Sequence, residues 1–346
     1  MNPPEISVLL PTFNYGRFLP QAIESVLAQT QADFELVICD DASTDDSARC
    51  IKNYASRDPR IRPLLRTGNV GMVRNWNACL ALARGRYVKF LFGDDCLTRP
   101  DALQRLAALL DQHPRATLAV SARLVIDERN AVTAVWDHLG PAGPQSGPDV
   151  VVRCLRQDRN LIGEPSAVMF RRASGRRGFD PALRQIVDQE MWFHLLAQGH
   201  LVYEPTPLCA FRHHALQQTA ANRASGVGPM ESLHLTTRHL RRIPARCLSR
   251  FDRAQIVFRT LHYSRKRNLR TAEILHAEEE LAALLPRRLT ALCWGLHRLR
   301  RPAQNLRRFL RHDRRPASVL GPQAGWVPLR WTPPPPPRVS RLTTIA

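Results

Sequence analysis

The feature that most constrains this fold is an apolar strand that runs directly into two adjacent carboxylates. Residues 87–92 (YVKFLF) predict the strand, and Gly93, Asp94 and Asp95 follow it. In an open α/β sheet, ligands bind beyond the carboxyl ends of the strands. Hard cations such as Mg²⁺ and Mn²⁺ bind carboxylates together with phosphate oxygens. The pair therefore indicates either a metal–diphosphate site at a sheet edge or a turn with a helix cap, which is a common use of aspartate.

Two earlier segments follow the same plan of an apolar strand and a polar loop. Residues 6–10 (ISVLL) are closed by the loop PTFNYG, and a helical spacing of apolar residues follows. Residues 34–39 (FELVIC) lead into Asp40 and Asp41 and then into a polar stretch suited to a helix start. The pattern predicts an α/β fold in which several polar strand ends meet at one edge.

Three longer stretches occur in a characteristic order: PTFNYGRFLPQAIESVLAQT, FELVICDDASTDDS and NVGMVRNWNACLALARGRYVKFLFGDD. Together they resemble the amino-terminal half of family 2 glycosyltransferases, of the bacterial cell-envelope or exopolysaccharide type, over roughly the first 215 residues. The resemblance implies a GT-A fold, which is a Rossmann-like mixed sheet flanked by helices. It also implies an inverting transfer from a nucleotide-diphosphate sugar donor, with Mn²⁺ or Mg²⁺ as cofactor.

The resemblance assigns one group of residues to the nucleotide. These positions are Pro11, Thr12, Phe13, Asp40, Asp41, Asn77 and Asp94. Phe13 would offer its ring for stacking on the base, and Asp41 matches the carboxylate that hydrogen-bonds the base. Asn77 matches an asparagine of the helix before the metal-binding strand. The residues alone leave other roles open, because Phe13 could belong to the core, Asn77 to a helix surface and Asp41 to a helix cap.

The resemblance places the metal beside the paired carboxylates. Asp94 and Asp95 match the Asp-x-Asp type of element, with Asp95 as the direct metal ligand. The first aspartate of the usual pattern is Phe92 here, so two carboxylates remain. A strand is predicted at residues 201–204, before Pro205 and Pro207. The segment FRHH that follows resembles the family's aromatic-Arg-x-His ending, which places His214 near the metal or diphosphate and Arg212 near phosphate charge. Without that context, adjacent histidines are more often polar surface groups.

The chemistry of an inverting transfer requires a base that takes the proton of the acceptor hydroxyl. Residues 185–196 show a helical spacing, and Asp188 stands four residues before Trp192, where the family places its catalytic carboxylate. Asp188 is therefore the predicted base, although an acidic residue at a helix start also has a purely electrostatic explanation. The resemblance assigns Glu190, Trp192 and, from the segment GEPSAVMFRR, Glu164 to the acceptor region.

The positive charge of the chain is concentrated in its last third. Residues 1–230 hold 26 basic and 23 acidic residues, whereas residues 231–346 hold 24 and 7. We expect a GT-A domain over 1–230, basic amphipathic helices over 231–315, and a Pro-rich, disordered tail over 316–346. Helices are expected at 254–263, 272–285 and 289–310. Leucines that alternate with arginines from 284 to 301 suit either an anionic membrane surface or helices packed on the catalytic domain.

The remaining composition bears on location and on alternative functions. We find no run of 18 apolar residues and expect no signal peptide, and the eight scattered cysteines suit a reducing compartment. We therefore expect a cytoplasmic protein. If the basic helices bind lipid, it would be peripheral at the inner membrane face. The expected acceptor is a glycan or lipid-linked hydroxyl. A nucleotidyltransferase would share the sheet and metal but calls for a Gly-rich phosphate loop. A basic nucleic-acid or membrane binder is the other alternative, although no nucleic acid is expected because the first 230 residues are nearly neutral.

Overall fold

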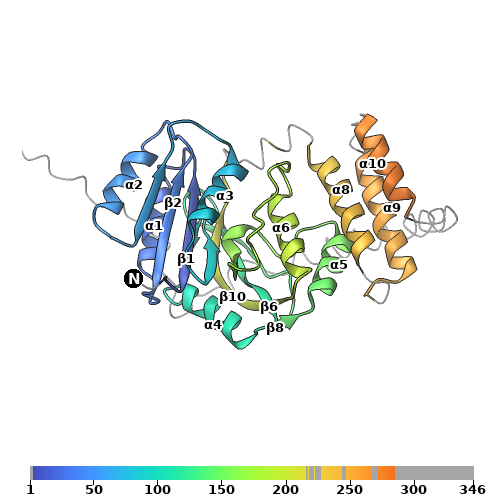
Figure 1. Ribbon diagram of the computed structural model, residues 1–346, viewed down its shortest axis with the longest axis horizontal. Helices are drawn as coiled ribbons and strands as arrows, with labels where there is room; N and C mark the ends of the chain where they lie inside the picture. The colour runs from blue at the N-terminus through green and yellow to red at the C-terminus, as the bar shows by residue number, and fades with distance from the viewer. Residues whose placement is uncertain are drawn as a thin grey trace, which may run out of the picture.

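The structure is a computed structural model, and it describes residues 3–215, 217, 222, 227–243, 247–266 and 272–284. Its centre is a mixed sheet with the strand order β3-β2-β1-β4-β9-β6-β10-β5. Helices cover both faces of this sheet, and a group of carboxyl-terminal helices lies at one end of the molecule (Figure 1).

The first half of the sheet is parallel. Strands β1 and β2 pair over their whole lengths, β3 pairs with β2, and β4 pairs with β1 on the other side. The bounds of these strands are β1 Ile6–Thr12, β2 Phe34–Asp40, β3 Ile61–Leu65 and β4 Tyr87–Phe90. The helices that connect them are α1 Leu19–Leu27, α2 Ser47–Ala55 and α3 Met72–Leu82. The carboxyl ends of β1, β2 and β4 therefore lie together at one edge.

The second half of the sheet mixes strand directions. β9 (Val168–Arg171) runs antiparallel between β4 and β6 (Ala116–Ile126), and β10 (His200–Arg212) runs parallel to β6. The short strands are β5 Cys96–Leu97 and β8 Gly143–Gln145, which pair with β10, and β7 Val132–Trp136, which pairs with β6. The helices of this half are α4 Ala102–Gln112, α5 Gly147–Gln157 and α6 Val187–Leu196.

Alternation of side chains along the strands builds two apolar layers. In β1, Leu9 joins one buried cluster, while Val8 and Leu10 join the other. The first cluster includes side chains of α3, α5 and α6, and the second includes side chains of α1 and α4. The sheet is thus covered by helices on both faces, as its parallel half requires.

Strand β10 is longer than the sequence suggests. The predicted strand of residues 201–204 continues through Pro205 and Pro207 to Arg212. Register shifts against β6 between Glu204 and Pro207 and between Pro207 and Cys209 accommodate the prolines, which cannot donate to the ladder. The continuation brings Arg212 to the same edge as the ends of β1, β2 and β4.

The carboxyl-terminal helices pack against α5 and α6 of the second half of the fold. They are α8 Val227–Arg242, α9 Arg250–Lys266 and α10 Ala272–Ala282. Leu233, Leu240 and Val257 belong to the same apolar cluster as α5 and α6, and Arg156 of α5 pairs with Asp252 of α9 at 2.5 Å. The helix expected at 289–310 and the tail expected at 316–346 lie outside the described residues.

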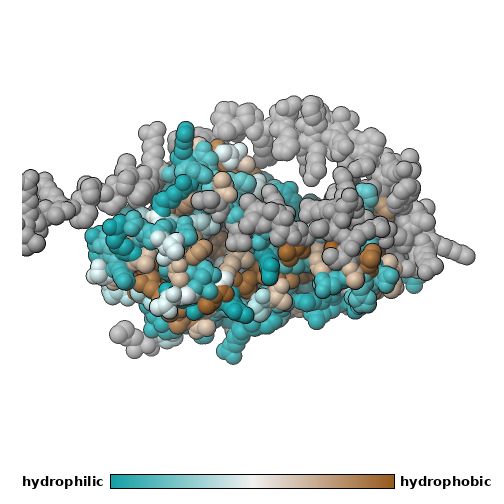
Figure 2. All heavy atoms as spheres, turned by 90° about the horizontal axis from the view of Figure 1, so that it is seen from above, coloured by the Kyte–Doolittle hydropathy of each residue, from teal (hydrophilic) through white to brown (hydrophobic). Residues whose placement is uncertain are grey.

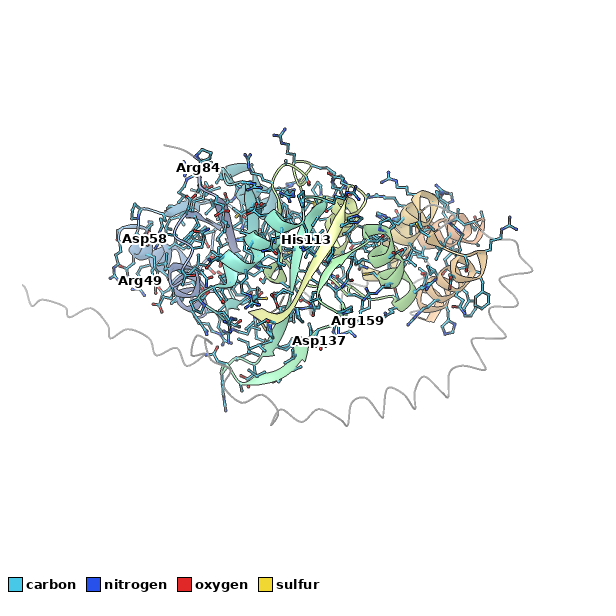
Figure 3. All side chains as sticks on the ribbon, turned by 90° about the horizontal axis from the view of Figure 1, so that it is seen from below. Arg49, Asp58, Arg84, His113, Asp137 and Arg159 are labelled. Carbon is cyan, nitrogen blue, oxygen red and sulfur yellow. The ribbon has the colours of Figure 1, made fainter. Side chains whose placement is uncertain are left out.

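Many of the charged side chains lie at the periphery of the described fold. Arg49 and Asp58 lie near α2, whereas Asp137 and Arg159 lie at the far side of the sheet (Figure 3). Polar side chains dominate the visible described surface, with apolar groups in separate patches (Figure 2). None of the described helices is both long enough and apolar enough to span a bilayer.

Candidate functional site

The paired carboxylates are held in place by the end of β10. Asp94 and Asp95 lie in the turn between β4 and β5, and both are buried. The backbone N–H of Arg212 donates to Asp95 Oδ1 at 2.9 Å, and Arg212 Nε donates to the Asp94 carbonyl at 2.7 Å. The same guanidinium donates to Gln21 Oε1 and to the Asp127 carbonyl. Arg212 therefore acts here as a clamp on the backbone of the carboxylate turn.

His214 faces the Asp94 carboxylate. Its Nε2 lies 3.0 Å from Asp94 Oδ2, and its ring contacts those of Tyr15 and Phe18 at centroid distances of 5.6 and 5.2 Å. Burial and the Asp94 carboxylate raise the pKa of Tyr15, so its hydroxyl stays protonated. Two distant stretches of the chain supply the Asp94–Asp95 pair and the segment with Arg212 and His214. The structure brings these four residues into one cluster.

The oxygen and nitrogen atoms of this cluster suit a divalent metal that is bound jointly by the protein and a substrate. Within the described residues, Asp95 Oδ2 is buried and accepts no hydrogen bond of standard geometry, although the Ser166 hydroxyl lies close enough to lower the pKa of Asp95. Burial, followed by the charge of Asp94, raises that pKa overall. No described group of three or more His, Cys, Asp and Glu side chains could hold a metal alone. Two carboxylates are nevertheless enough for Mg²⁺, which commonly binds through one or two carboxylates together with waters and substrate phosphates.

The two aspartates after β2 organise the neighbouring loops. Asp41 accepts backbone N–H groups of Val70 and Gly71, both at 2.9 Å, where α3 begins. Asp40 accepts the Ser43 backbone N–H at 3.1 Å and also the Ser43 hydroxyl. Both carboxylates are buried, so in this structure they hold the loops at the carboxyl edge. Their predicted contact with a nucleotide stays a prediction.

The end of β1 provides an aromatic ring that is open to solvent. Pro11 and Thr12 are buried, whereas Phe13 is 44% exposed. The Thr12 hydroxyl oxygen has no hydrogen-bond partner among the described residues. A phenylalanine this exposed is not part of the core, and its ring is open to stacking on a ligand.

Asn77 is used to hold a loop of the second half. Its side-chain nitrogen donates to the Phe179 carbonyl at 2.9 Å, and its oxygen accepts the Phe179 backbone N–H at 2.8 Å. Its neighbour Asn75, which the sequence reasoning missed, is buried and donates to the Cys39 carbonyl beneath Asp40 at 2.9 Å. The Asn75 oxygen has no partner among the described residues. The structure therefore brings Asn75, rather than Asn77, next to the end of β2.

Asp188 lies at the start of α6 and is partly buried. Asn160 Nδ2 donates to Asp188 Oδ2 at 3.0 Å, and the Gln189 backbone N–H donates to Oδ1 at 2.7 Å. Burial, followed by the charge of Glu164, raises the pKa of Asp188 to about 7. A carboxylate with this pKa is suited to exchange a proton near neutral pH.

Glu164 connects the two parts of the site. It forms an ion pair with Arg123, with 2.5 Å between Oε2 and Nε, and its charge raises the pKa of both Asp95 and Asp188. Glu164 is therefore near enough to both Asp95 and Asp188 for its charge to act on each of them. Arg123 and Asn160, which orient Glu164 and Asp188, carried no recognisable signal in the sequence.

Two of the residues assigned to the acceptor make their contacts elsewhere. Glu190 is buried and pairs with Arg177 at 2.5 Å and with Arg238 of α8 at 3.2 Å. Trp192 lies in the core, where its Nε1 donates to the Gly163 carbonyl at 2.9 Å. Trp192 thereby supports the loop that carries Glu164, whereas Glu190 links α6 to α8.

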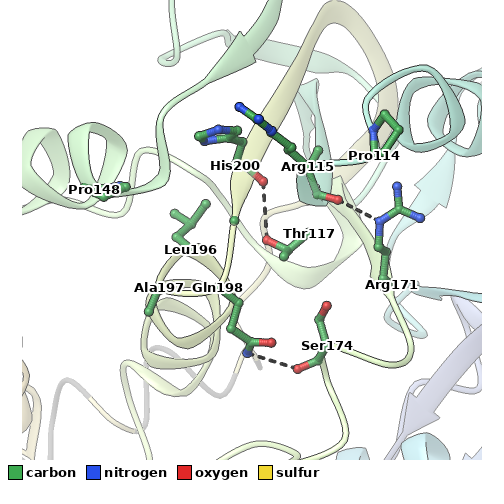
Figure 4. Close-up of a pocket in the computed structure, with 12 residues that line it drawn as sticks. Pro114, Arg115, Thr117, Pro148, Arg171, Ser174, Leu196, Ala197, Gln198 and His200 are labelled. Atoms are coloured by element: carbon green, nitrogen blue, oxygen red, sulfur yellow. Dashed lines mark hydrogen bonds between the residues drawn. The ribbon is translucent and has the colours of Figure 1, made fainter.

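A cavity of about 530 Å³ lies at the opposite end of the sheet. Figure 4 shows its lining, which includes Arg115 and Thr117 at the start of β6 and His200 at the start of β10. The Thr117 hydroxyl donates to the His200 carbonyl, and Arg171 donates to the Ala116 carbonyl. These contacts join the strands, and the amino ends of parallel strands are not where open α/β sheets bind ligands.

The mixed sheet, flanked by helices and with carboxylates at its carboxyl edge, is the arrangement of the GT-A fold, and comparison with known proteins gives the family. Residues 7–176 match the family described as Glycosyl transferase family 2. The uncharacterized protein MT1568 of Mycobacterium tuberculosis is 34% identical over 225 residues, which are 62% of this chain and 69% of that protein. The chain belongs to glycosyl transferase family 2.

Solved structures share the fold at low sequence identity. TarS of S. aureus, residues 1–349 in complex with UDP-GlcNAc, has a TM-score of 0.63 and 18% identity, with 83% of each chain covered. The mannosyltransferase PcManGT of Pyrobaculum calidifontis, in complex with GDP-Man and Mn²⁺, has a TM-score of 0.55 and 15% identity, covering 87% of this chain and 81% of that one. These likenesses confirm the predicted GT-A fold.

Proposed function

We propose that this protein transfers a sugar, with inversion, from a nucleotide-diphosphate sugar to a hydroxyl group of a glycan or lipid-linked acceptor in polysaccharide synthesis. The observation that carries the proposal is the set of carboxylates around one region. Asp94 and Asp95 follow β4, Asp188 lies at the start of α6, and Glu164 is near enough to Asp95 and Asp188 for its charge to act on both. Metal–diphosphate binding and proton removal are the two tasks that such a transfer requires.

Asp188 is the proposed general base. Its raised pKa means that the carboxylate, once ionised, accepts the proton of the acceptor hydroxyl readily near neutral pH. The Asn160 amide and the Gln189 N–H hold its two oxygens, which fixes the direction of the carboxylate. Glu164, with Arg123 behind it, would hydrogen-bond the acceptor beside the base.

Asp95, with Asp94 and His214, would hold Mn²⁺ or Mg²⁺ together with the diphosphate. A bound divalent metal would neutralise the charge that develops on the leaving nucleoside diphosphate. Arg212 keeps the Asp94–Asp95 turn in place through its backbone contacts. The exposed Phe13 ring would stack on the base, at the edge where Asp40 and Asp41 order the loops.

The nucleotide sugars bound to the related structures support a donor of this class, as UDP-GlcNAc is bound to TarS and GDP-Man to PcManGT. We place the enzyme in the cytoplasm, where such donors are made. The basic carboxyl-terminal region would bring it to anionic lipid at the inner membrane face.

The direct test is a donor screen with the full chain. Uridine and guanosine diphosphate sugars would be tested for thermal stabilisation and for slow hydrolysis, with Mn²⁺, with Mg²⁺ and with a chelator. We expect one donor to raise the melting temperature only when metal is present, because the diphosphate and the metal bind together. A protein that neither binds nor hydrolyses any nucleotide sugar would contradict the proposed function.

A further inference from the structure

The start of α6, which carries Asp188, is held by a carboxylate from a much later part of the chain. Glu231 of α8 is buried, being 5% exposed. Its Oε1 accepts the Arg184 backbone N–H at 2.7 Å, and its Oε2 accepts the N–H groups of Gln185 and Ile186 at 2.9 and 3.1 Å. Three successive backbone donors are thus satisfied by one side chain.

These donors would otherwise lack protein partners. Arg184 and Gln185 precede α6 and Ile186 is its N-cap, so none of the three N–H groups has an acceptor within the helix, and the positive end of the helix dipole favours a carboxylate there. Ile186 is the residue that precedes the first turn of α6, and Asp188 follows two positions later. Glu231 therefore fixes the backbone from which the proposed base projects.

A second set of contacts joins α6 and α8 further along both helices. Arg238 of α8 pairs with Glu190 of α6 at 3.2 Å, and the rings of His239 and Phe193 meet at a centroid distance of 5.0 Å. The two helices are adjacent in Figure 1. Because the contacts at Glu231 and at Arg238 hold α6 at both the backbone and the side chains, α6 has little freedom to rotate or slide relative to α8.

We propose that Glu231 is a positioning residue for the catalytic base, and that α8 is part of the catalytic unit rather than an accessory to it. The inference rests on the proposed function of Asp188. Glu231 does not touch the reacting atoms; it acts through the backbone of residues 184–186. Its contribution should appear in the rate of transfer rather than in donor binding, because Asp94, Asp95 and Phe13 lie on other elements.

Two variants of the full chain test this role. Glu231→Gln keeps the size of the side chain but removes the charge and one acceptor, and Glu231→Asp keeps the charge but shortens the reach. The matched control is Glu280→Gln, because Glu280 is also a glutamate of the carboxyl-terminal helices but pairs with Arg241 at 3.6 Å at the surface, away from α6.

The expected result has two parts. Amide hydrogen exchange in wild type should show protection at residues 184–186, which Glu231→Gln loses and Glu280→Gln keeps. With the donor found by screening, kcat of Glu231→Gln should fall roughly 10- to 100-fold, since a misplacement of about 1 Å can cost that much, while KM for the donor stays within about twofold. Glu231→Asp should give smaller losses of both protection and kcat, and it serves if Glu231→Gln fails to fold.

Three outcomes would overturn the inference, and each would do so for a different reason. Wild-type protein without protection at residues 184–186 would mean that Glu231 does not hold them in solution. Lost protection with unchanged kcat would mean that the contact does not position the base. A wild-type chain that transfers sugar from no nucleotide donor would overturn the proposed function, and the positioning role with it, even where the protection is present.

Discussion

The carboxylates of the site differ in how fully their oxygens are hydrogen-bonded within the protein. Asp95 is buried with one oxygen left without a standard hydrogen bond among the described residues, whereas Asp41 has both oxygens filled by backbone N–H groups. An unsatisfied buried acceptor is unfavourable in the protein alone and becomes favourable when a cation binds. This contrast supports Asp95 as a ligand-binding residue and Asp41 as an organiser of the loops.

Asp95→Ala is expected to abolish metal-dependent donor binding. Removal of the carboxylate takes away a principal counter-charge for the metal, so turnover should fall by roughly 10²- to 10³-fold. Isothermal titration with Mn²⁺ and donor, together with initial rates, would measure both effects. Asp46→Asn is the control, because Asp46 forms an exposed pair with Arg49 that contributes little. Full turnover of Asp95→Ala in Mn²⁺ would refute the metal assignment.

Asp188→Asn is expected to lower kcat by about 10²- to 10⁴-fold with little change in nucleotide affinity, because it removes the base and keeps the shape. In wild type, kcat should rise with pH through about 7, as the carboxyl loses its proton. A rate–pH profile of both proteins would check this. Equal losses of binding and rate would point instead to a structural role at the helix start.

The same pKa predicts an effect on stability. Because folding raises the pKa of Asp188 above its unfolded value, the favourable contribution of its protonated form is present at low pH and is lost as pH rises through about 7. Asp188→Asn should therefore raise the melting temperature more at pH 8 than at pH 5. Thermal unfolding at the two pH values measures this difference, and an equal shift at both would contradict the raised pKa.

At the scale of elements, the loop of residues 160–164 is fixed by contacts from several sides. Gly163 has a φ of +117°, and a Cβ placed there would lie 2.7 Å from the Arg123 guanidinium. Its carbonyl accepts hydrogen bonds from Trp192 and from Asn160. The loop thus needs a glycine both for its backbone conformation and for the close approach of Arg123.

Gly163→Ala is expected to lower both stability and activity. The positive φ alone costs about 1–2 kcal/mol for an L-residue, and displacement of Arg123 also disturbs its ion pair with Glu164. Gly140→Ala is the matched control, because Gly140 has a φ of +88° with no atom within 4 Å of the added Cβ. Thermal unfolding and initial rates would separate the two variants, and equal effects would mean that Arg123 is not displaced.

Some of these elements could be predicted from the sequence and others could not. The apolar runs of β2 and β4 and the acidic start of α6 are local patterns, so the sequence could single out Asp41, Asp95 and Asp188 as candidates. Strand β10 was predicted too short because a proline usually ends a strand, and only pairing with β6 shows that the bulges absorb it. Glu231, Arg123 and Asn160 escaped prediction because their partners are distant in sequence. Asn75 carried a signal that could have found it, namely its place beside Asn77 in the same helix.

At the scale of the whole molecule, some arginines of the carboxyl-terminal helices have acceptors within the protein. Arg238, Arg253 and Arg259 of α8 and α9 have protein acceptors at Glu190, Leu240 and Arg156. Thirteen arginines and one aspartate lie after residue 284. Because this stretch holds far more basic than acidic residues, we expect a membrane interaction to depend mainly on the residues after 284.

Vesicles of phosphatidylcholine with increasing phosphatidylglycerol would test that expectation by co-sedimentation. The full chain should bind more as the anionic lipid increases and less as salt is added, because exposed charges are screened over about 8 Å at physiological ionic strength. A chain that ends at residue 284 should lose this binding and keep its transfer rate to a soluble acceptor. Binding that ignores lipid charge would favour a role for these residues within the protein.

The contacts of Arg212 also determine when the enzyme becomes competent during its synthesis. Gln21, to which the guanidinium donates, lies 191 residues earlier, and β10 must be inserted between β6 and β5 before Arg212 reaches Asp94 and Asp95. Long-range pairing of this kind is slow, and domains are completed as units when the chain leaves the ribosome. A nascent chain that ends before β10 therefore carries Asp94 and Asp95, the proposed metal ligands, without the contacts of Arg212. We expect such a chain neither to bind nor to hydrolyse donor until β10 has been made.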